Sequence, residues 1–346
     1  MTLSRLTPSL LTGKSLSYSQ AKVFFLSAFK GKLEEPQIKA WLLLMADRGE
    51  TPEELRACAD ALQAVEKVQA TAFRDLLDTC GTGGDGKHSI NVSTLAAFTA
   101  AGAGLRVAKH GNRAISSRSG SSDVMEALGV RLDAGKKAMM TSLRQAGIAY
   151  FHAPFYHPVF ARLQPLRKKM GTRTIFNLLG PLVNPCRLAY QLTGVSRPEQ
   201  LKLYAEVLRK RSGLKRALVC HSADGMDEIS LNAKTRYALI EGSKVRYGTI
   251  DPAKLGFKKA PDRLFRGGSA RENAAFAKAF LSGKIQDPRA DLVMLNAGAA
   301  IWLAGMTNSL AAGIQAARQS VETGRALRAL ETLVRVTREA GERHDS

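Results

Sequence analysis

A glycine-rich segment near residue 80 has the residue types that bind phosphate groups. Cys80-Gly-Thr-Gly-Gly-Asp-Gly86 follows a short apolar run and leads, through Ser89-Ile-Asn-Val-Ser-Thr94, into an expected helix. Because glycine has no side chain, the backbone can approach a ligand closely and point its N–H groups at phosphate oxygens. The start of the helix adds a partial positive charge and further N–H groups. We therefore predict a phosphate-binding loop, although such turns also connect strands and helices without any ligand.

The order of these glycines differs from two common nucleotide-binding motifs. It is neither G-x-G-x-x-G, which binds dinucleotides, nor G-x-x-x-x-G-K-[ST], which binds nucleoside triphosphates. The sequence thus indicates phosphate binding of another kind.

A second polar segment begins where a strand is expected to end. It reads Lys109-His-Gly-Asn-Arg-Ala-Ile-Ser-Ser117, and Ser119-Gly-Ser-Ser-Asp123 follows it. Ligands of open α/β sheets bind at the carboxyl ends of the strands. The segment offers an ammonium, a guanidinium, an imidazole, an amide and several hydroxyl groups, which suit anions and sugar hydroxyls. The alternative is a solvated turn in which Ser122 or Asp123 caps the next helix.

The positive charge of the chain is concentrated in the same stretches. The formal net charge is +21, and strongly basic proteins bind nucleic acid, anionic membrane surfaces or acidic small molecules. No acidic residue lies between Asp85 and Asp123 or from Ala153 to Pro198, whereas both stretches carry several Lys and Arg residues. This distribution favours an anionic ligand held in a cleft.

Helices at the amino end form the first part of the expected scaffold. Ser19 could cap a helix over residues 21–29, Pro36 can start a second that runs to residue 45, and Pro52-Glu-Glu54 has the composition of the first turn of a third. We therefore expect a small all-helical N-terminal domain over residues 1–73, with helices near residues 160–185 packing against it.

Short apolar runs that alternate with amphipathic helices form the second part. Strands are expected at residues 76–78, 105–108, 148–151 and 216–220, with a hairpin over 237–247 and a long helix over 310–333. Such alternation predicts a mainly parallel central sheet flanked by helices. The fold class is therefore α/β, with a larger α/β domain over residues 74–346.

Three motifs, Gly81-Thr-Gly-Gly-Asp, Asn91-Val-Ser-Thr and Lys109-His-Gly-Asn-Arg, resemble in order and spacing the signature of the anthranilate phosphoribosyltransferase family. Gly171-Thr-Arg-Thr-Ile-Phe-Asn177, Gly180-Pro-Leu-Val-Asn-Pro185, Asp224-Gly-Met-Asp-Glu-Ile-Ser230 and Leu295-Asn-Ala-Gly-Ala agree, so that the likeness covers roughly residues 20 to 335. It implies transfer of the phosphoribosyl group from 5-phosphoribosyl 1-pyrophosphate (PRPP) to the amine of anthranilate, giving N-(5-phosphoribosyl)anthranilate and diphosphate, in tryptophan biosynthesis.

The resemblance also implies where the two substrates bind. Anthranilate is expected to contact Gly81, Asn112 and Arg167, because a planar guanidinium pairs well with a carboxylate; the alternative is that Arg167 is a plain surface arginine. At position 89 the family more often has Thr, and a Ser hydroxyl can do the same work. The residues implied for PRPP are Gly81, Gly84, Asp85, Ser89, Asn91, Val92, Ser93, Thr94, Lys109, His110, Gly111, Asn112, Arg113, Ala114, Ile115, Ser116, Ser117 and Ser121.

Asp227 and Glu228, together with the hydroxyl of Ser93, resemble the magnesium ligands of the family. Mg²⁺ prefers oxygen ligands, often one or two carboxylates with substrate phosphates and water. Adjacent acids in a loop are also commonly only solvated, and His221-Ser222 stands before them where the family pattern has His-Gly. His110 and His157 belong to no Ser/His/Asp or Cys/His constellation, so that no dedicated catalytic acid or base is assigned.

Two alternatives remain for a chain of this kind. The positive charge could mark a non-catalytic nucleic-acid-binding member of the same fold, or the enzyme could be a phosphoribosyltransferase or nucleoside phosphorylase with another acceptor. The intact motifs, and the lack of aromatic residues among the basic runs, favour the transferase.

The remaining composition indicates a cytoplasmic protein. Its four cysteines lie far apart without a C-x-x-C pair, which is typical of reduced thiols. The strongest apolar run near the amino end, Val23-Phe-Phe-Leu26, is far shorter than the roughly 20 residues of a membrane span, so that no membrane partner is expected. The family resemblance implies a homodimer formed through the helical domain.

Overall fold

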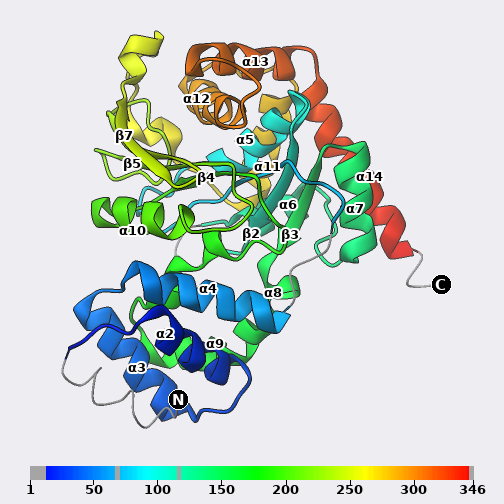
Figure 1. Ribbon diagram of the computed structural model, residues 1–346. Coiled ribbons are helices and arrows are strands. Elements are labelled where there is room, and N and C mark those ends of the chain that lie inside the picture. Colours follow the sequence, from blue (N-terminus) through cyan, green and yellow to red (C-terminus); the bar gives the residue numbers. More distant parts are fainter. Residues whose placement is uncertain (1–12, 67–70, 115–117, 343–346) are drawn as a thin grey trace.

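The computed structural model describes residues 13–66, 71–114 and 118–342. Helices at the amino end form a small part that lies below the rest of the molecule in Figure 1, and a larger part is built around a single sheet. The expected combination of an all-helical part and an α/β part is confirmed. None of the helices in these ranges is long and apolar enough to cross a membrane.

Seven strands form the sheet in the order β3-β2-β1-β4-β5-β6-β7. The pairs from β3 across to β5 are parallel, whereas β6 pairs antiparallel with both β5 and β7, and β6 and β7 form the expected hairpin. A mainly parallel sheet was the prediction from the sequence, but strand β4 was not anticipated. The strands are β1 (Leu76–Thr79), β2 (Arg106–Gly111), β3 (Ile148–His152), β4 (Tyr190–Gly194), β5 (Arg216–Ser222), β6 (Thr235–Glu241) and β7 (Lys244–Ile250).

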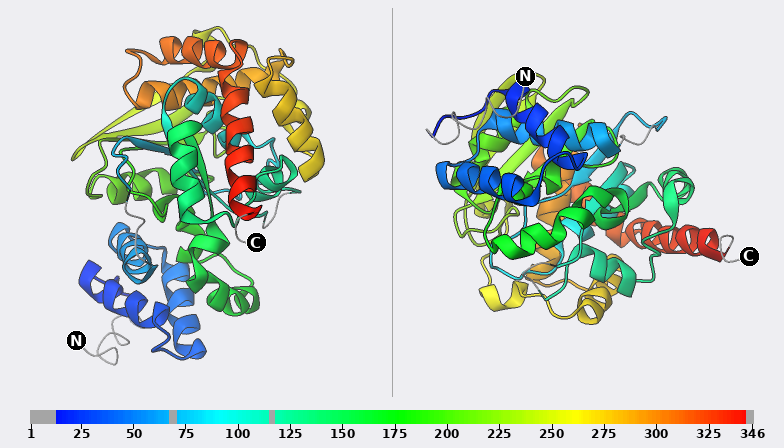
Figure 2. Two further views of the ribbon diagram at one scale, coloured as in Figure 1. Left: turned by 90° about the vertical axis from the view of Figure 1, so that its right-hand side faces the viewer. Right: turned by 90° about the horizontal axis from the view of Figure 1, so that it is seen from below.

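Helices connect and cover the strands, and Figure 2 shows them on both sides of the sheet. The helices of the amino-terminal part are α2 (Tyr18–Phe29), α3 (Glu35–Arg48) and α4 (Pro52–Glu66). Those that follow are α5 (Val92–Gly102), α6 (Ser121–Ala127), α7 (Gly135–Gln145), α8 (Ala153–Tyr156), α9 (Pro158–Met170), η2 (Ile175–Leu178), η3 (Gly180–Leu182), α10 (Pro198–Leu208), η4 (Pro252–Leu255), η5 (Asp262–Phe265), α11 (Ala270–Leu281), α12 (Pro288–Leu303), α13 (Leu310–Glu322) and α14 (Arg325–Glu342).

Two local expectations were wrong. The single helix expected over residues 310–333 is two helices, because Gly324 adopts a left-handed conformation with φ 69° between α13 and α14. The cap of the first helix is Ser17 rather than Ser19. Its hydroxyl accepts the N–H of Gln20, and the Gln20 side chain bonds back to the Ser17 N–H.

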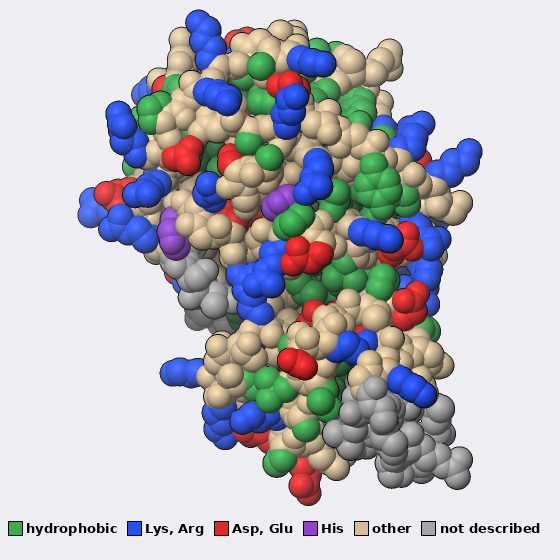
Figure 3. Space-filling model, turned by 90° about the vertical axis from the view of Figure 1, so that its left-hand side faces the viewer, with side chains coloured by type: hydrophobic (Ala, Val, Ile, Leu, Met, Phe, Trp, Pro, Cys, Tyr) green, Lys and Arg blue, Asp and Glu red, His purple; other side chains and the backbone are tan. Residues whose placement is uncertain are grey.

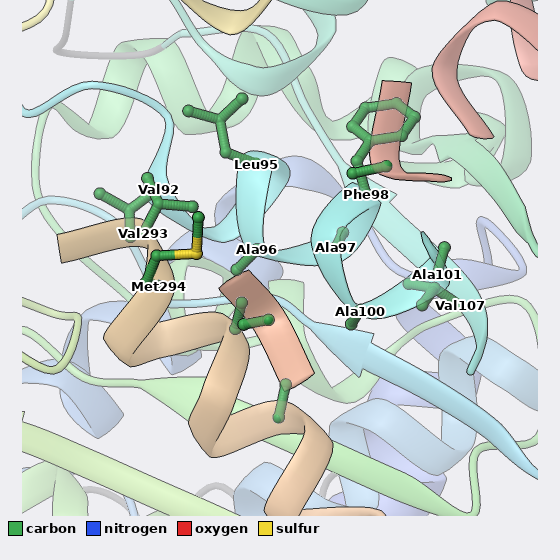
Figure 4. Packing of buried hydrophobic residues seen from close by; sticks show 14 of the residues in the cluster. Val92, Leu95, Ala96, Ala97, Phe98, Ala100, Ala101, Val107, Val293 and Met294 are labelled. Atoms are coloured by element: carbon green, nitrogen blue, oxygen red, sulfur yellow. The ribbon is translucent and has the colours of Figure 1, made fainter. Parts of the chain in front are cut away.

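The two faces of the sheet bury different apolar clusters. Along β5, Leu218 and Cys220 pack on the side of α5 and α12, whereas Ala217 and Val219 pack on the side of α10. This alternation follows from the period of two along a strand. Figure 4 shows the small side chains of α5 close to α12, where Val92 lies beside Met294.

The amino-terminal helices share their core with later parts of the chain. Rings of Phe25 and Phe29 lie 6.4 and 6.0 Å from the ring of Phe176, which belongs to η2, and Phe160 of α9 packs against the same ring. The segments near residues 160–185 therefore lie against α2 to α4. The boundary between residues 73 and 74 stays a prediction.

Candidate active site

The glycine-rich loop lies where the connections of the sheet change direction. From β1 the chain runs to β2 and β3 on one side, and then returns to β4 on the other side of β1. Such a switch point opens a crevice at the carboxyl ends of the strands, where ligands of open α/β sheets bind. The loop is fixed there, since the Thr82 N–H donates to Gly194 O over 2.9 Å and the Thr82 hydroxyl accepts the Ser196 N–H.

The backbone of this loop forms a concave array of donors. Gly83, Gly84 and Gly86 have positive φ values of 67°, 76° and 72°, which side chains rarely tolerate. Within the described parts of the chain, the N–H groups of Gly84, Asp85 and Gly86 donate to no protein acceptor. The helix α5 starts just beyond, with Asn91 as its N-cap residue. Free N–H groups in such an arrangement bind anions.

Two carboxylates face this loop from the segment after β5. Asp227 accepts the Gly83 N–H at 2.6 Å, and Glu228 accepts the Ser93 N–H at 3.2 Å. No Lys or Arg of the described residues forms an ion pair with either. Desolvation, followed by repulsion from Asp85, raises the pKa of Asp227 to about 7, and desolvation and the Asp227 charge raise that of Glu228. Burial and mutual repulsion thus oppose full ionisation of this pair, which a bound cation would favour.

The second polar segment contributes mainly buried groups. Lys109 is 3% exposed, and its ammonium donates to the carbonyls of Thr79 and His110. Beneath it, Asp78 accepts the His110 N–H and an N–H of the Asn184 side chain. Burial lowers the pKa of His110, whose Nδ1 bonds to Gly180 O. Lys109 is therefore held in the interior rather than extended into solvent.

The end of this segment is fastened to helix α6. The N-cap residue of α6 is Gly120 rather than Ser122 or Asp123. Asp123 lies in the first turn, where it accepts the N–H groups of Gly120 and Ala114 and also binds Arg113. The Arg113 guanidinium further pairs with Glu126 at 2.9 and 3.1 Å. Arg113 is thus engaged with acids of α6. The expected ligands Ile115, Ser116 and Ser117 lie outside the described residues.

Ser121 and Asn112 lie together at the mouth of the segment. The Asn112 N–H donates to the Ser121 hydroxyl, which is also bonded to the Tyr150 hydroxyl at 2.9 Å. A side chain at Gly111 would overlap both hydroxyl groups. The glycine of the Lys109-His-Gly motif is therefore required by close packing.

Arg167 approaches the cleft from the helical part. It lies in the last turn of α9, with its guanidinium over the Phe160 ring at 5.4 Å. Burial lowers its pKa, and no carboxylate of the described residues pairs with it. The His157 ring lies 6.3 Å from Phe160 and 5.1 Å from His110. This chain of rings joins α9 to the second polar segment.

Comparison with known proteins places the chain in a family. Residues 74–327 match the glycosyl transferase family a/b domain, and residues 5–65 match its helical bundle domain. The anthranilate phosphoribosyltransferase of Desulfosudis oleivorans is 40% identical over 339 residues, which is 98% of this chain and 99% of that protein. The chain belongs to the anthranilate phosphoribosyltransferase family.

Solved anthranilate phosphoribosyltransferases share the fold over nearly their whole length. The enzyme from Thermus thermophilus is 39% identical, with a TM-score of 0.89 over 96% of this chain and 98% of that chain. The enzyme from Saccharomyces cerevisiae, solved in complex with PRPP and Mg, is 25% identical, with a TM-score of 0.89 over 97% and 98% of the two chains. The expected family and fold are thereby confirmed.

Three residues that position this site were not singled out from the sequence. Gly194 ends β4, and a side chain there would overlap the carbonyl oxygen of Asp227. The Asn296 amide bonds to both the N–H and the carbonyl of Ile229, next to Glu228. The Asn273 amide bonds to Asn91 and Ser119. A glycine or a buried amide carries no functional signal of its own, although Asn296 stands in the quoted Leu295-Asn-Ala-Gly-Ala motif.

Basic side chains are spread over the surface of both parts of the molecule. Figure 3 shows Lys and Arg side chains on both the larger part and the narrower helical part. Basic groups on both sides of a crevice raise the local concentration of an anionic substrate.

Proposed function

We propose that this protein moves the phosphoribosyl group of PRPP onto the amine of anthranilate, giving N-(5-phosphoribosyl)anthranilate and diphosphate. The reaction belongs to tryptophan biosynthesis. Membership of the anthranilate phosphoribosyltransferase family over nearly the whole chain supports this function. The observation that carries it is the concave array of free N–H groups over Gly84–Gly86 beside Asp227 and Glu228.

PRPP is proposed to bind along the two loops. Its phosphate groups would accept the free N–H groups of Gly84 and Asp85. They would lie beside Ser93 and Thr94 at the start of α5, whose hydroxyl groups would donate because their N–H groups already bond to Glu228 and Asn91. Ser89, from the segment that leads into α5, and Asn112 and Ser121, from the second polar segment, would face the ribose and its 5-phosphate. Arg113, which already pairs with two acids, would act by holding that segment in shape.

Asp227 and Glu228 suit a magnesium ion. Both carboxylates are held by backbone N–H groups through one oxygen and have no cationic partner among the described residues, and Ser93 lies beside Glu228. Hard oxygen ligands of this kind are those that Mg²⁺ prefers. When bound, Mg²⁺ would supply positive charge against the diphosphate leaving group.

Anthranilate is proposed to bind between Arg167, Gly81 and Asn112. Arg167 is partly buried and lacks an acidic partner among the described residues, so that the substrate carboxylate would be its first ion pair. Gly81 allows close approach, since even a Cβ there would meet the Asp227 carboxylate at 2.8 Å.

The chemistry proposed for these residues is positioning and charge stabilisation. The amine of anthranilate is already nucleophilic, so that the protein must only hold it behind C1 of the ribose. Loop N–H groups stabilise charge on the departing diphosphate, usually a large catalytic contribution. We expect displacement with inversion at C1 and no dedicated base.

Assembly and location extend this proposal. We propose a homodimer formed through the helical part and a cytoplasmic location. All four cysteines, Cys58, Cys80, Cys186 and Cys220, are buried free thiols, which supports a reducing compartment.

A fluorescence assay tests the function directly. Purified protein should consume anthranilate only when both PRPP and Mg²⁺ are present. Asp227→Ala and Glu228→Ala should abolish most of this turnover, whereas Asp133→Ala, an exposed carboxylate before α7, should not. No consumption under any condition would refute the transferase and favour the nucleic-acid-binding alternative. Turnover that is unaffected by Mg²⁺ would refute the metal assignment.

A further inference from the structure

Arg173 reaches from the helical part of the molecule to the phosphate loop. It lies in the motif Gly171-Thr-Arg-Thr-Ile-Phe-Asn177, to which the proposed function assigns no role. Its guanidinium donates to the carbonyl of Gly84 at 2.8 Å. A side chain on Gly84 would overlap that guanidinium, so the two groups are in direct contact.

The backbone that carries Arg173 is firmly placed. Gly171 ends α9 in a left-handed conformation with φ 62°. On the other side, Thr174 is 3% exposed and its N–H donates to the Asn177 side chain, which belongs to η2. Phe176 of η2 is buried among the rings of the helical part. Arg173 is therefore a long exposed side chain on a rigid base.

The guanidinium of Arg173 bonds to a weaker hydrogen-bond acceptor than a phosphate group would be. An arginine has five N–H donors, and among the described residues Arg173 uses one, toward a neutral carbonyl. No carboxylate in the described ranges forms an ion pair with it. Hydrogen bonds between charged groups are roughly twice as strong as neutral ones. A phosphate group in the loop would therefore compete successfully with Gly84 O for the guanidinium.

The same loop also presents free donors. Among the described residues, the N–H groups of Gly84, Asp85 and Gly86 have no protein acceptor, and the helix α5 starts behind them. A phosphate bound there would lie between these N–H groups and the guanidinium of Arg173.

We propose that Arg173 is a phosphate ligand, supplied by the helical part, that binds a phosphate group of PRPP at the Gly84–Gly86 loop. The inference rests on the proposed function. In the free protein the guanidinium donates a hydrogen bond to the carbonyl oxygen of Gly84. When the substrate binds, it turns to the phosphate oxygens. Because Arg167 lies six residues earlier in the same rigid segment, this contact also holds the anthranilate site against the loop.

Binding measurements without turnover test this inference. Titration calorimetry with pyrophosphate and Mg²⁺, and separately with ribose 5-phosphate, shows which phosphate Arg173 contacts. Loss of a charge-assisted hydrogen bond should weaken binding roughly 10- to 100-fold in Arg173→Ala for one of these ligands. Arg173→Lys should recover part of the loss, because it keeps the charge without the planar fork.

Lys168→Ala is the matched control. It removes one exposed positive charge from the last turn of α9, the helix that precedes Arg173, and its affinities should stay within about twofold of wild type. Thermal unfolding of each variant checks that the fold is intact. If Arg173→Ala binds both ligands as wild type does, or loses affinity only as much as Lys168→Ala, the inference is overturned.

The outcome separates the inference from the proposed function. Wild-type protein that binds pyrophosphate through Arg173 but forms no product would refute the function and leave the ligand role standing. If the wild-type protein forms product and Arg173→Ala keeps the wild-type affinity for PRPP, the ligand role alone is refuted. A wild-type protein that binds neither ligand would overturn the ligand role, whereas anthranilate consumption decides the proposed function separately.

Discussion

Replacing Asn296 with Ala should loosen the loop that carries Asp227 and Glu228. Asn296 is 1% exposed and lies in the middle of α12. Its side chain accepts the Ile229 N–H and donates to the carbonyls of Ile229 and Leu292, each at 2.9 Å. It is thus a two-sided clamp on the backbone immediately after Glu228.

The size of the effect follows from these three bonds. A typical intramolecular hydrogen bond contributes about 1 kcal/mol, and a buried group left without a partner costs about 1–3 kcal/mol. Ile229 is completely buried, so water cannot replace the amide without entering the core. We expect Asn296→Ala to lower the free energy of unfolding by about 3 kcal/mol. Loss of such supporting contacts behind a metal ligand typically weakens metal binding roughly 10- to 100-fold, so the Mg²⁺ concentration for half-maximal turnover should rise by about that factor.

Urea unfolding and a Mg²⁺ titration of anthranilate consumption measure the two effects. Asn308→Ala provides the control, since this asparagine is exposed and follows the same helix. Asn296→Asp keeps the acceptor for the Ile229 N–H but buries a carboxylate against the carbonyl oxygens of Ile229 and Leu292, so its stability should fall below that of Asn296→Ala. A wild-type Mg²⁺ requirement in Asn296→Ala would show that the clamp does not position the acids.

Two further predictions concern residues near the carboxyl ends of strands β4 and β2. Gly194→Ala should abolish turnover at any Mg²⁺ concentration, because the added Cβ would displace the Asp227 backbone; wild-type kinetics in this variant would contradict the close approach. Burial lowers the pKa of His110, so only the unfolded chain gains its proton as the pH falls below about 6.5. His110 thus contributes stability that is present above that pH and lost below it. Urea unfolding at about pH 7.5 and 5.5, on either side of the ordinary histidine pKa, should show a larger acid-induced loss in wild type than in His110→Asn, and equal losses would refute this.

Local patterns determined much of the fold. Residues 148–151 specify a strand because the run is apolar on both faces, as a strand covered by helices must be, and Leu76 and Leu77 do the same for the strand over 76–78. The glycines at 83, 84 and 86 indicated a loop with unusual backbone angles because only glycine adopts positive φ readily. Strand β4 escaped prediction because its residues include Gln191 and Thr193, whose polar groups are paired with each other in the interior.

The tertiary structure decided which residues come together in the site. The sequence by itself named the phosphate loop and, through family resemblance, the acids at 227 and 228, but it contained no measure of how near they lie. Their meeting depends on β4 entering beside β1 and on the Gly194 contact with Asp227, which are packing events between segments far apart in the chain. Arg173 shows the same limit. One arginine among many in a basic chain becomes distinctive only when folding brings its guanidinium to Gly84, because a hydrogen bond depends on distance and direction, which residue type and spacing do not fix.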